Sequence, residues 1–236
     1  MLAELRSLLD AAPPSASRSV YRQLIVGENC LGKRTIATRK LSAQRLCELY
    51  GLDPEIMLFR IMRRFWGRDE RGHPLLALLV ALARDPLLRL TAGSVLGLHV
   101  GEELDRSRMT DVIRENTGHR FNDSILDKIV RNAASSWTQS GHLAGKSRKL
   151  RRAVAPTYWV AAYALVLGYA QGLRGESLFQ SFWASVLDTG PDQLLQLAMD
   201  AKRAGLLDMK SAGGITQLSF SQLLTDEERR LIHGAS

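Results

Sequence analysis

NDSILDKIVRNAASSWTQSGHLAGKSRKLRRAVAP occupies residues 122–156, and every other segment of the chain is interpreted around it. Asn122 or Asp123 provides an N-cap, and neither Gly nor Pro follows until Gly141. An N-cap followed by an uninterrupted run of this length predicts a helix of about five turns. Leu126, Val130, Ala133 and Trp137 recur at helical spacing, which predicts a buried face.

The opposite face of this predicted helix is polar. It carries Lys128, Arg131, Asn132, Ser135 and Gln139. The residues after Gly141 form a short basic segment around a Gly-containing turn, which we call the basic hairpin (residues 141–152). Its cations are Lys146, Arg148, Lys149, Arg151 and Arg152. Helix, Gly break and basic hairpin, in that order, are typical of a winged helix.

The positive charge of the chain is concentrated in this region. No acidic residue occurs between Asp127 and Glu176, and the interval holds eight cations, as many as the formal net charge of +8. The rest of the chain has 24 basic and 24 acidic residues. A local excess of cations favours a polyanionic partner, because Lys and Arg that neutralise phosphates release condensed counterions. A solvated basic loop without a partner is the alternative.

Composition and termini limit the class of protein. With 236 residues and 45% hydrophobic content, the chain can bury one large core or two modest ones. Cys30 and Cys47 offer neither a disulfide framework nor zinc-ligand spacing. The N-terminus lacks the apolar region of a signal peptide, and the apolar runs at residues 74–83 and 158–170 are shorter than the roughly 20 residues of a membrane span. We expect a cytoplasmic protein, with both runs buried as core helices and without contact with a membrane.

The residues before the basic region predict a mainly α-helical scaffold. A short helix over residues 2–11 stops at Pro13, and Asp53–Pro54 and Asp85–Pro86 each predict the start of a helix. A second basic patch lies upstream. It consists of Lys33, Arg34, Arg39, Lys40 and Arg45.

The last third of the chain predicts a further small helical domain. Helices are expected over residues 157–172, 176–187 and 191–204. A hairpin with strands at 206–209 and 215–220, a turn through Gly213 and Gly214, and a final helix over 226–233 then complete a second winged-helix-like unit. The predicted organisation is an N-terminal helix and linker (1–19), a helical DNA-binding domain (20–157) and a C-terminal domain (158–236). Because acidic residues outnumber basic ones in this last unit, we expect it to pack against protein and not against phosphates.

No catalytic signature is present in the sequence. None of the five histidines stands at ligand or triad spacing from a second His or Cys, and neither a Gly-rich phosphate loop nor a GxSxG or HExxH motif occurs. Glu102, Glu103 and Asp105 could bind a metal, but three acids in a loop are more often a solvated turn. We therefore expect a protein that is not an enzyme and has no metal or cofactor.

Three segments together resemble the BrxA family, small accessory proteins of BREX phage-defence systems. They are LLALLVALARDPLLR, DKIVRNAASSWTQSGHLAGKSRKLRRAVAPT and, upstream, the basic segment GKRTIATRKLSAQRL. The similarity covers residues 21–157. It implies a mostly helical DNA-binding protein that acts beside other defence-system subunits. The residues it implies as DNA contacts are Lys33, Arg34, Arg39, Lys40 and the cluster from Lys146 to Arg152.

These observations predict a DNA-binding accessory protein with weak sequence preference. The polar face of the 124–140 helix would approach duplex DNA, and the basic hairpin would grip flanking phosphates. Five to eight phosphate contacts would give a salt slope on the order of −4 to −7. Two alternatives stay open: an adaptor that docks its basic patch on a partner subunit, and an RNA-binding protein. The oligomeric state is not predicted.

Overall fold

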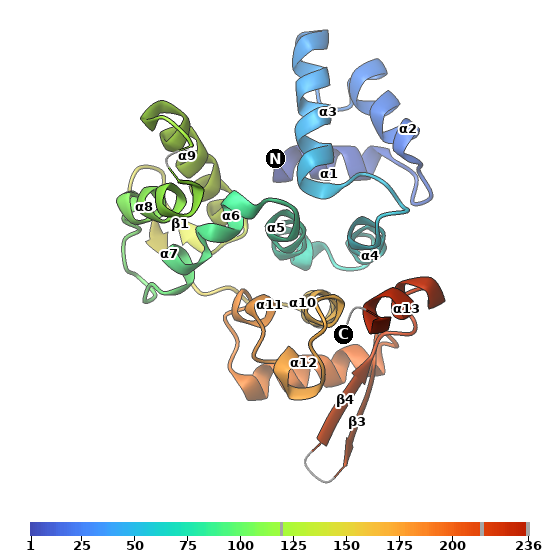
Figure 1. The fold of residues 1–236 in the computed structure, drawn as a ribbon. Helices are drawn as coiled ribbons and strands as arrows, with labels where there is room; N and C mark the ends of the chain where they lie inside the picture. The colour runs from blue at the N-terminus through green and yellow to red at the C-terminus, as the bar shows by residue number, and fades with distance from the viewer. Residues whose placement is uncertain (119, 213–214, 235–236) are drawn as a thin grey trace.

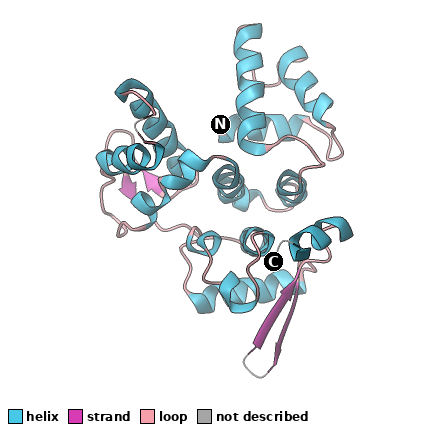
Figure 2. Cartoon of the chain, in the orientation of Figure 1, coloured by secondary structure: helices cyan, strands magenta, loops and turns pink. Residues whose placement is uncertain are grey.

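The computed structural model of the protein describes residues 1–118, 120–212 and 215–234. The chain is mainly α-helical with two short antiparallel hairpins, as Figure 2 shows. The mainly α fold class predicted from the sequence is therefore confirmed at this level. Cys30 and Cys47 are free thiols.

The N-terminal helices form one side of the molecule (Figure 1). Helix α3 begins after Thr35, whose hydroxyl accepts from the backbone N–H of Thr38, and ends at Gly51, where φ is +91°. A side chain is strained at such a positive φ, so Gly51 ends the helix efficiently. The helices here are α1 (Leu2–Ala11), α2 (Arg18–Arg22), which continues as a π-helical turn (Gln23–Gly27), and α3 (Ile36–Tyr50).

One of the two helix starts predicted at an Asp–Pro pair differs from the structure. Asp53 does not cap a helix: it forms a tight turn, in which its carboxylate accepts from the Glu55 N–H and its carbonyl accepts from the Ile56 N–H. The helix starts after this turn. Asp85 does cap a helix, as predicted; this helix is short and ends at the buried Thr91. The elements are α4 (Met57–Trp66), α5 (His73–Arg84), α6 (Pro86–Leu90) and α7 (Ala92–Leu96).

The region around the basic hairpin lies on the other side of α5 from α4 (Figure 1). The predicted long helix and the hairpin after Gly141 are both present, and the strands pair Leu143 with Arg151 and Ala144 with Leu150. The elements are α8 (Arg106–Thr117), α9 (Asp123–Gln139), β1 (Leu143–Ala144) and β2 (Leu150–Arg151).

The last third of the chain packs below α4 and α5 (Figure 1). The predicted hairpin is present, but its first strand, expected at 206–209, lies at Asp208–Ala212, while the second lies close to the expected 215–220. The predicted turn at Gly213 and Gly214 lies outside the described residues. The expected helix over 176–187 is a 3₁₀ turn (Gly175–Leu178) followed by a short helix. The elements are α10 (Tyr158–Ala170), α11 (Phe182–Ser185), α12 (Pro191–Arg203), β3 (Asp208–Ala212), β4 (Ile215–Ser219) and α13 (Asp226–Gly234).

The two apolar runs are the centre of the hydrophobic core. Every residue of α5 from Leu75 to Leu82, and every residue of α10 from Val160 to Tyr169, is buried. Helix α10 packs against α12, α11, α5 and α4, so the core is continuous across the predicted domain boundary at residue 157. Among the described residues, no helix combines the length and the apolar character that a membrane crossing requires.

Candidate nucleic-acid interface

Helix α9 is fixed to the core by its apolar face, as the sequence predicts. Asn122 caps the helix through a hydrogen bond of 2.9 Å from the Ile125 N–H to its side-chain oxygen. Trp137 is fully buried, and its indole N–H donates to the hydroxyl of Thr91 at 2.9 Å. These contacts fix the rotation of α9 about its axis, and therefore the direction of its polar face.

The polar face of α9 is partly engaged by other residues. Lys128, Arg131, Asn132 and Ser135 are exposed, whereas Gln139 is half-buried. Arg131 pairs with Asp127 one turn earlier, at 3.0 Å. The side-chain oxygen of Gln139 accepts from the backbone nitrogen atoms of Met1 and Leu2, so this residue joins α9 to the start of α1.

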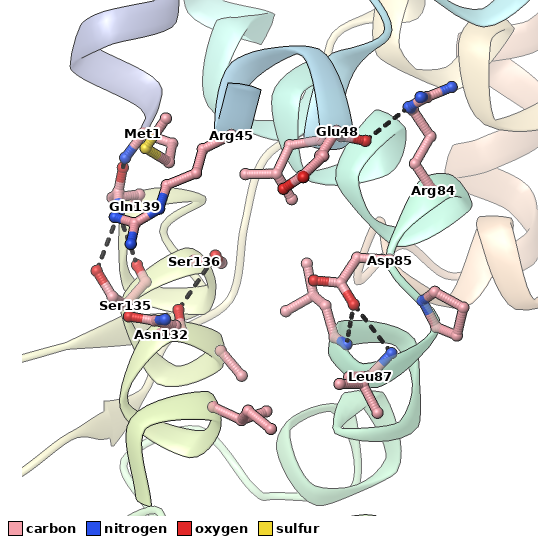
Figure 3. Close-up of a pocket in the computed structure, with 15 residues that line it drawn as sticks. Met1, Arg45, Glu48, Arg84, Asp85, Leu87, Asn132, Ser135, Ser136 and Gln139 are labelled. Carbon is pink, nitrogen blue, oxygen red and sulfur yellow. Dashed lines mark hydrogen bonds between the residues drawn. The ribbon is translucent and has the colours of Figure 1, made fainter. Parts of the chain in front are cut away.

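The same face lines a cleft between α9 and α3. The cleft has a volume of about 540 Å³, and its α9 wall includes Asn132, Ser135 and Gln139 (Figure 3). The sequence predicts that all five polar residues point outward to a duplex. This expectation needs correction for the C-terminal half of the helix, which faces α3. Lys128 and Arg131 do not line the cleft.

The basic hairpin projects a short loop of cations. The chain turns at Gly145, where φ is +108° and where a Cβ atom would overlap the carbonyl oxygen of Arg148. Lys146 is exposed, and the Arg148 side chain is 78% exposed. The half-buried Lys149 donates from Nζ to the Gly145 carbonyl at 3.0 Å. The loop therefore presents its positive charge on one short turn.

A third segment, residues 101–104, pairs with the outer edge of β2. The Arg151 N–H donates to the Glu102 carbonyl and the Leu104 N–H donates to the Lys149 carbonyl, both at 2.8 Å. This pairing brings Glu103 to Arg148, where the carboxylate accepts at 2.7 Å and 2.9 Å. The hydrogen bond from Arg148 lowers the pKa of Glu103, so the pair is ionised at neutral pH. The acidic turn thus lies against the basic hairpin.

Arg151 must be removed from the predicted DNA contacts. It is 3% exposed, and its guanidinium is ion-paired with Asp188 and donates to the Arg152 carbonyl. A buried cation paired with a half-buried carboxylate is a structural element, because releasing it to bind a phosphate would leave that carboxylate without its cation. Arg152 is exposed, and within the described ranges its guanidinium has no hydrogen-bond or ion-pair partner.

The second basic patch lies apart from the basic hairpin, at the start of α3 (Figure 1). Lys33 pairs with Glu4 at 3.2 Å, and Arg39 donates to the carbonyl groups of Val26 and Lys33. Arg34 and Lys40 are exposed. The structure therefore does not bring these residues to the basic hairpin, and two of the four upstream cations predicted as DNA contacts, Lys33 and Arg39, have structural partners.

The three acids proposed as an alternative metal site have separate structural partners. Glu102 accepts from the His99 N–H, Glu103 pairs with Arg148, and Asp105 caps α8 by accepting from the Ser107 N–H. In the ranges that the structure describes, no group of three or more His, Cys, Asp or Glu side chains is arranged to hold a metal ion.

His142 is a buried histidine with a lowered pKa. His142 is fully buried, and burial lowers its pKa. Its Nε2 lies 2.8 Å from the Val186 carbonyl and its Nδ1 lies 2.8 Å from the Ser140 hydroxyl. Because a carbonyl can only accept, Nε2 carries the proton of the neutral ring and donates to Val186, and the Ser140 hydroxyl donates to the Trp137 carbonyl at 2.9 Å. The residue anchors the basic hairpin to the segment before α12.

Comparison with known proteins yields no match: no family model fits the chain, and no curated protein or solved structure is significantly similar to it. The resemblance to the BrxA family therefore depends on the three quoted segments alone.

Proposed function

We propose that the protein binds duplex DNA through a winged-helix unit formed by residues 73–152. The unit would consist of α5 to α7, the edge segment 101–104, α8, the recognition helix α9 and the hairpin β1–β2. This order of helices followed by a hairpin supports the assignment. The role as an accessory component of a BREX phage-defence system, beside other defence subunits, rests on the resemblance and is part of the same proposal.

The observation that carries the proposal is the set of exposed cations on α9 and on the hairpin that follows it. Lys128, Lys146 and Arg152 are exposed and have no ion-pair partner among the described residues. Exposed, unpaired cations are those that can neutralise phosphates and release counterions. Together with Lys149 they give about four phosphate contacts, hence a salt slope of about −4, and Arg131 and Arg148 can add to it if they exchange their carboxylates for phosphates.

Weak sequence preference is expected from the same geometry. Asn132, Ser135 and Gln139, which could read base edges, face α3 across the cleft and not the open side of α9. The remaining contacts are cations that bind phosphates and carry no sequence information.

Fluorescence anisotropy with a random duplex at several salt concentrations tests the proposal. The test variant replaces Lys146, Arg148, Lys149 and Arg152 with Ala and leaves the buried Arg151 intact. The control variant replaces four exposed arginines elsewhere, Arg18, Arg22, Arg68 and Arg71, and so changes the net charge equally. We expect salt-dependent binding that the test variant loses and the control variant retains.

Other outcomes would separate the alternatives. Absence of binding by the wild type at low salt would reject the DNA proposal and favour the adaptor that docks its basic patch on a partner subunit. Preference for an A-form RNA duplex over DNA of the same length would favour the RNA alternative.

A further inference from the structure

The cleft between α3 and α9 has the volume of a small-molecule site and an open, polar lining. Its volume of about 540 Å³ lies within the roughly 300–1,000 Å³ of typical ligand pockets. One wall is α9, the opposite wall is α3, and α6 with the end of α5 closes the base (Figure 3). The volume and the walls of this cleft are independent of the proposed binding of DNA.

Several polar groups in the cleft are already satisfied by the protein. Arg84 donates to the carbonyl groups of Glu48 and Cys47. The Asp85 carboxylate accepts from the N–H groups of Leu87 and Leu88, as the dashed lines in Figure 3 show. These groups shape the base of the cleft and are not free to bind a ligand.

Two polar groups on opposite walls have no partner among the described residues. The guanidinium of Arg45, on α3, makes no hydrogen bond or ion pair there, and Figure 3 shows it pointing toward Gln139 and Ser135 of α9. The side-chain amide of Asn132, on α9, is likewise unpaired within the described ranges. A guanidinium and an amide that face one cleft can bind two different parts of one ligand.

A carboxylate also lines the cleft, on the same wall as Arg45. Glu48 is one turn after Arg45 on α3, and one of its oxygen atoms accepts from Gln44 at 2.8 Å. Its other oxygen can accept hydrogen bonds from hydroxyl groups, as acidic residues do from ribose in nucleotide sites. Leu49, Leu87 and Ile129 add apolar surface that can cover the face of a base.

We propose that this cleft binds a nucleoside monophosphate. Arg45 would bind the phosphate through paired N–H donors, Glu48 would accept from the ribose hydroxyls, and the Asn132 amide would donate to and accept from the edge of the base. With one unpaired cation and a carboxylate beside it, the lining suits one phosphate better than the charge of a triphosphate.

Isothermal titration calorimetry of the full chain tests this site with AMP, ATP, adenosine and inorganic phosphate as separate probes. We expect AMP to bind in one-to-one ratio, and ATP, adenosine and phosphate to bind at least about tenfold more weakly. Adenosine lacks the charged hydrogen bonds to Arg45, each of which contributes about a tenfold factor or more. Phosphate lacks the groups that Glu48 and Asn132 would bind, and the additional charges of ATP would meet the Glu48 carboxylate. Arg45→Ala should weaken AMP binding by about tenfold or more. Arg22→Ala, an exposed arginine on α2 outside the cleft, should leave it unchanged.

A second variant tests the location without removing a charge. Ser136 lines the cleft and is half-buried, so Ser136→Leu fills the space and should also reduce AMP binding. Circular dichroism and urea denaturation of both variants check that the fold is retained. Three results would overturn the proposal: no binding of AMP, equal binding of phosphate and AMP, or AMP binding that neither variant weakens. Each can occur whether or not the protein binds DNA.

Discussion

The guanidinium of Arg151 in β2 forms a buried ion pair with the carboxylate of Asp188 in the segment before α12. The Arg151 side chain is 4% exposed and that of Asp188 is 14% exposed. The second carboxylate oxygen of Asp188 accepts from the Val154 N–H at 3.2 Å. Asp188 itself adopts a left-handed backbone conformation, with φ at +52°. The pair therefore attaches the basic hairpin to the last third of the chain.

Asp188→Asn should lower the free energy of unfolding by about 3 kcal/mol, because the substitution leaves a buried guanidinium without a counter-ion. Asn tolerates the left-handed backbone, so the charge is the main change. Urea denaturation measures the loss. Replacing both partners, as Arg151→Met with Asp188→Asn, should recover part of the lost stability. If the free energy of unfolding of Asp188→Asn lay within about 0.5 kcal/mol of the wild type, the ion pair would not stabilise the fold.

Gly145 fixes the geometry of the basic loop. Gly145→Ala should cost roughly 1–3 kcal/mol for the positive φ alone and more for the overlap with the Arg148 carbonyl. It should also weaken DNA binding, because the loop cations move. The matched control is Gly172→Ala, where φ is also positive, at +89°, but no atom lies within 4 Å of the added Cβ. Equal losses of stability in the two variants would contradict the steric argument.

Acidification should destabilise the protein through His142. Burial lowers the pKa of the folded histidine below its ordinary value of 6.5, so below that pH the unfolded chain binds a proton that the folded chain does not. The contribution of the neutral His142 to the free energy of unfolding is fully present above pH 6.5. Below that pH the free energy of unfolding falls by up to about 1.4 kcal/mol per pH unit. Asp188 and Arg151 flank the ring and act in opposite directions on its pKa.

Denaturation between pH 7 and pH 5 isolates this effect. For Glu4 and Glu228, burial raises the pKa, but hydrogen bonds and nearby cations outweigh it and hold the pKa below the ordinary value of 4.5. Their contribution is therefore lost only at lower pH. His142→Gln should flatten the profile between pH 7 and pH 5, and a profile that keeps its slope in this variant would assign the effect to another group.

The sequence predicts α9 and its hairpin well because local signals specify them. The Asn122 cap, the buried face that includes Trp137 and the break at Gly141 all act within a few residues, and the structure has each of them where the sequence places it. The winged-helix assignment, the interface residues and the function remain predictions. The predicted start of α4 is wrong by a few residues, because the Asp53 carboxylate accepts from the Glu55 N–H within a turn and does not cap a helix.

The electrostatics of the interface could not be predicted from the sequence. Glu103 is 45 residues from Arg148, and Asp188 is 37 residues from Arg151. The basic hairpin has no acidic residue of its own, but the fold brings carboxylates from distant segments against two of its arginines. The orientation of the polar face of α9 toward α3 is also a long-range effect, since a helical pattern shows which residues share a face and not which element that face meets.

Removing the carboxylate that pairs with Arg148 should strengthen DNA binding. Glu103→Gln takes away a negative charge beside the loop and frees a guanidinium whose side chain is 78% exposed. One additional phosphate contact steepens the salt slope by about 0.9, and the affinity at low salt should rise a few-fold. Because the pair is exposed, the fold should be nearly unaffected.

Glu55→Gln is the control, since Glu55 is also exposed but lies before α4, away from the basic hairpin. It removes the same charge and should leave the salt slope unchanged. An increase in slope for Glu103→Gln alone would place Arg148 in contact with phosphate. If both variants gain equally, the effect is one of net charge, and if neither gains, the basic hairpin does not face the DNA.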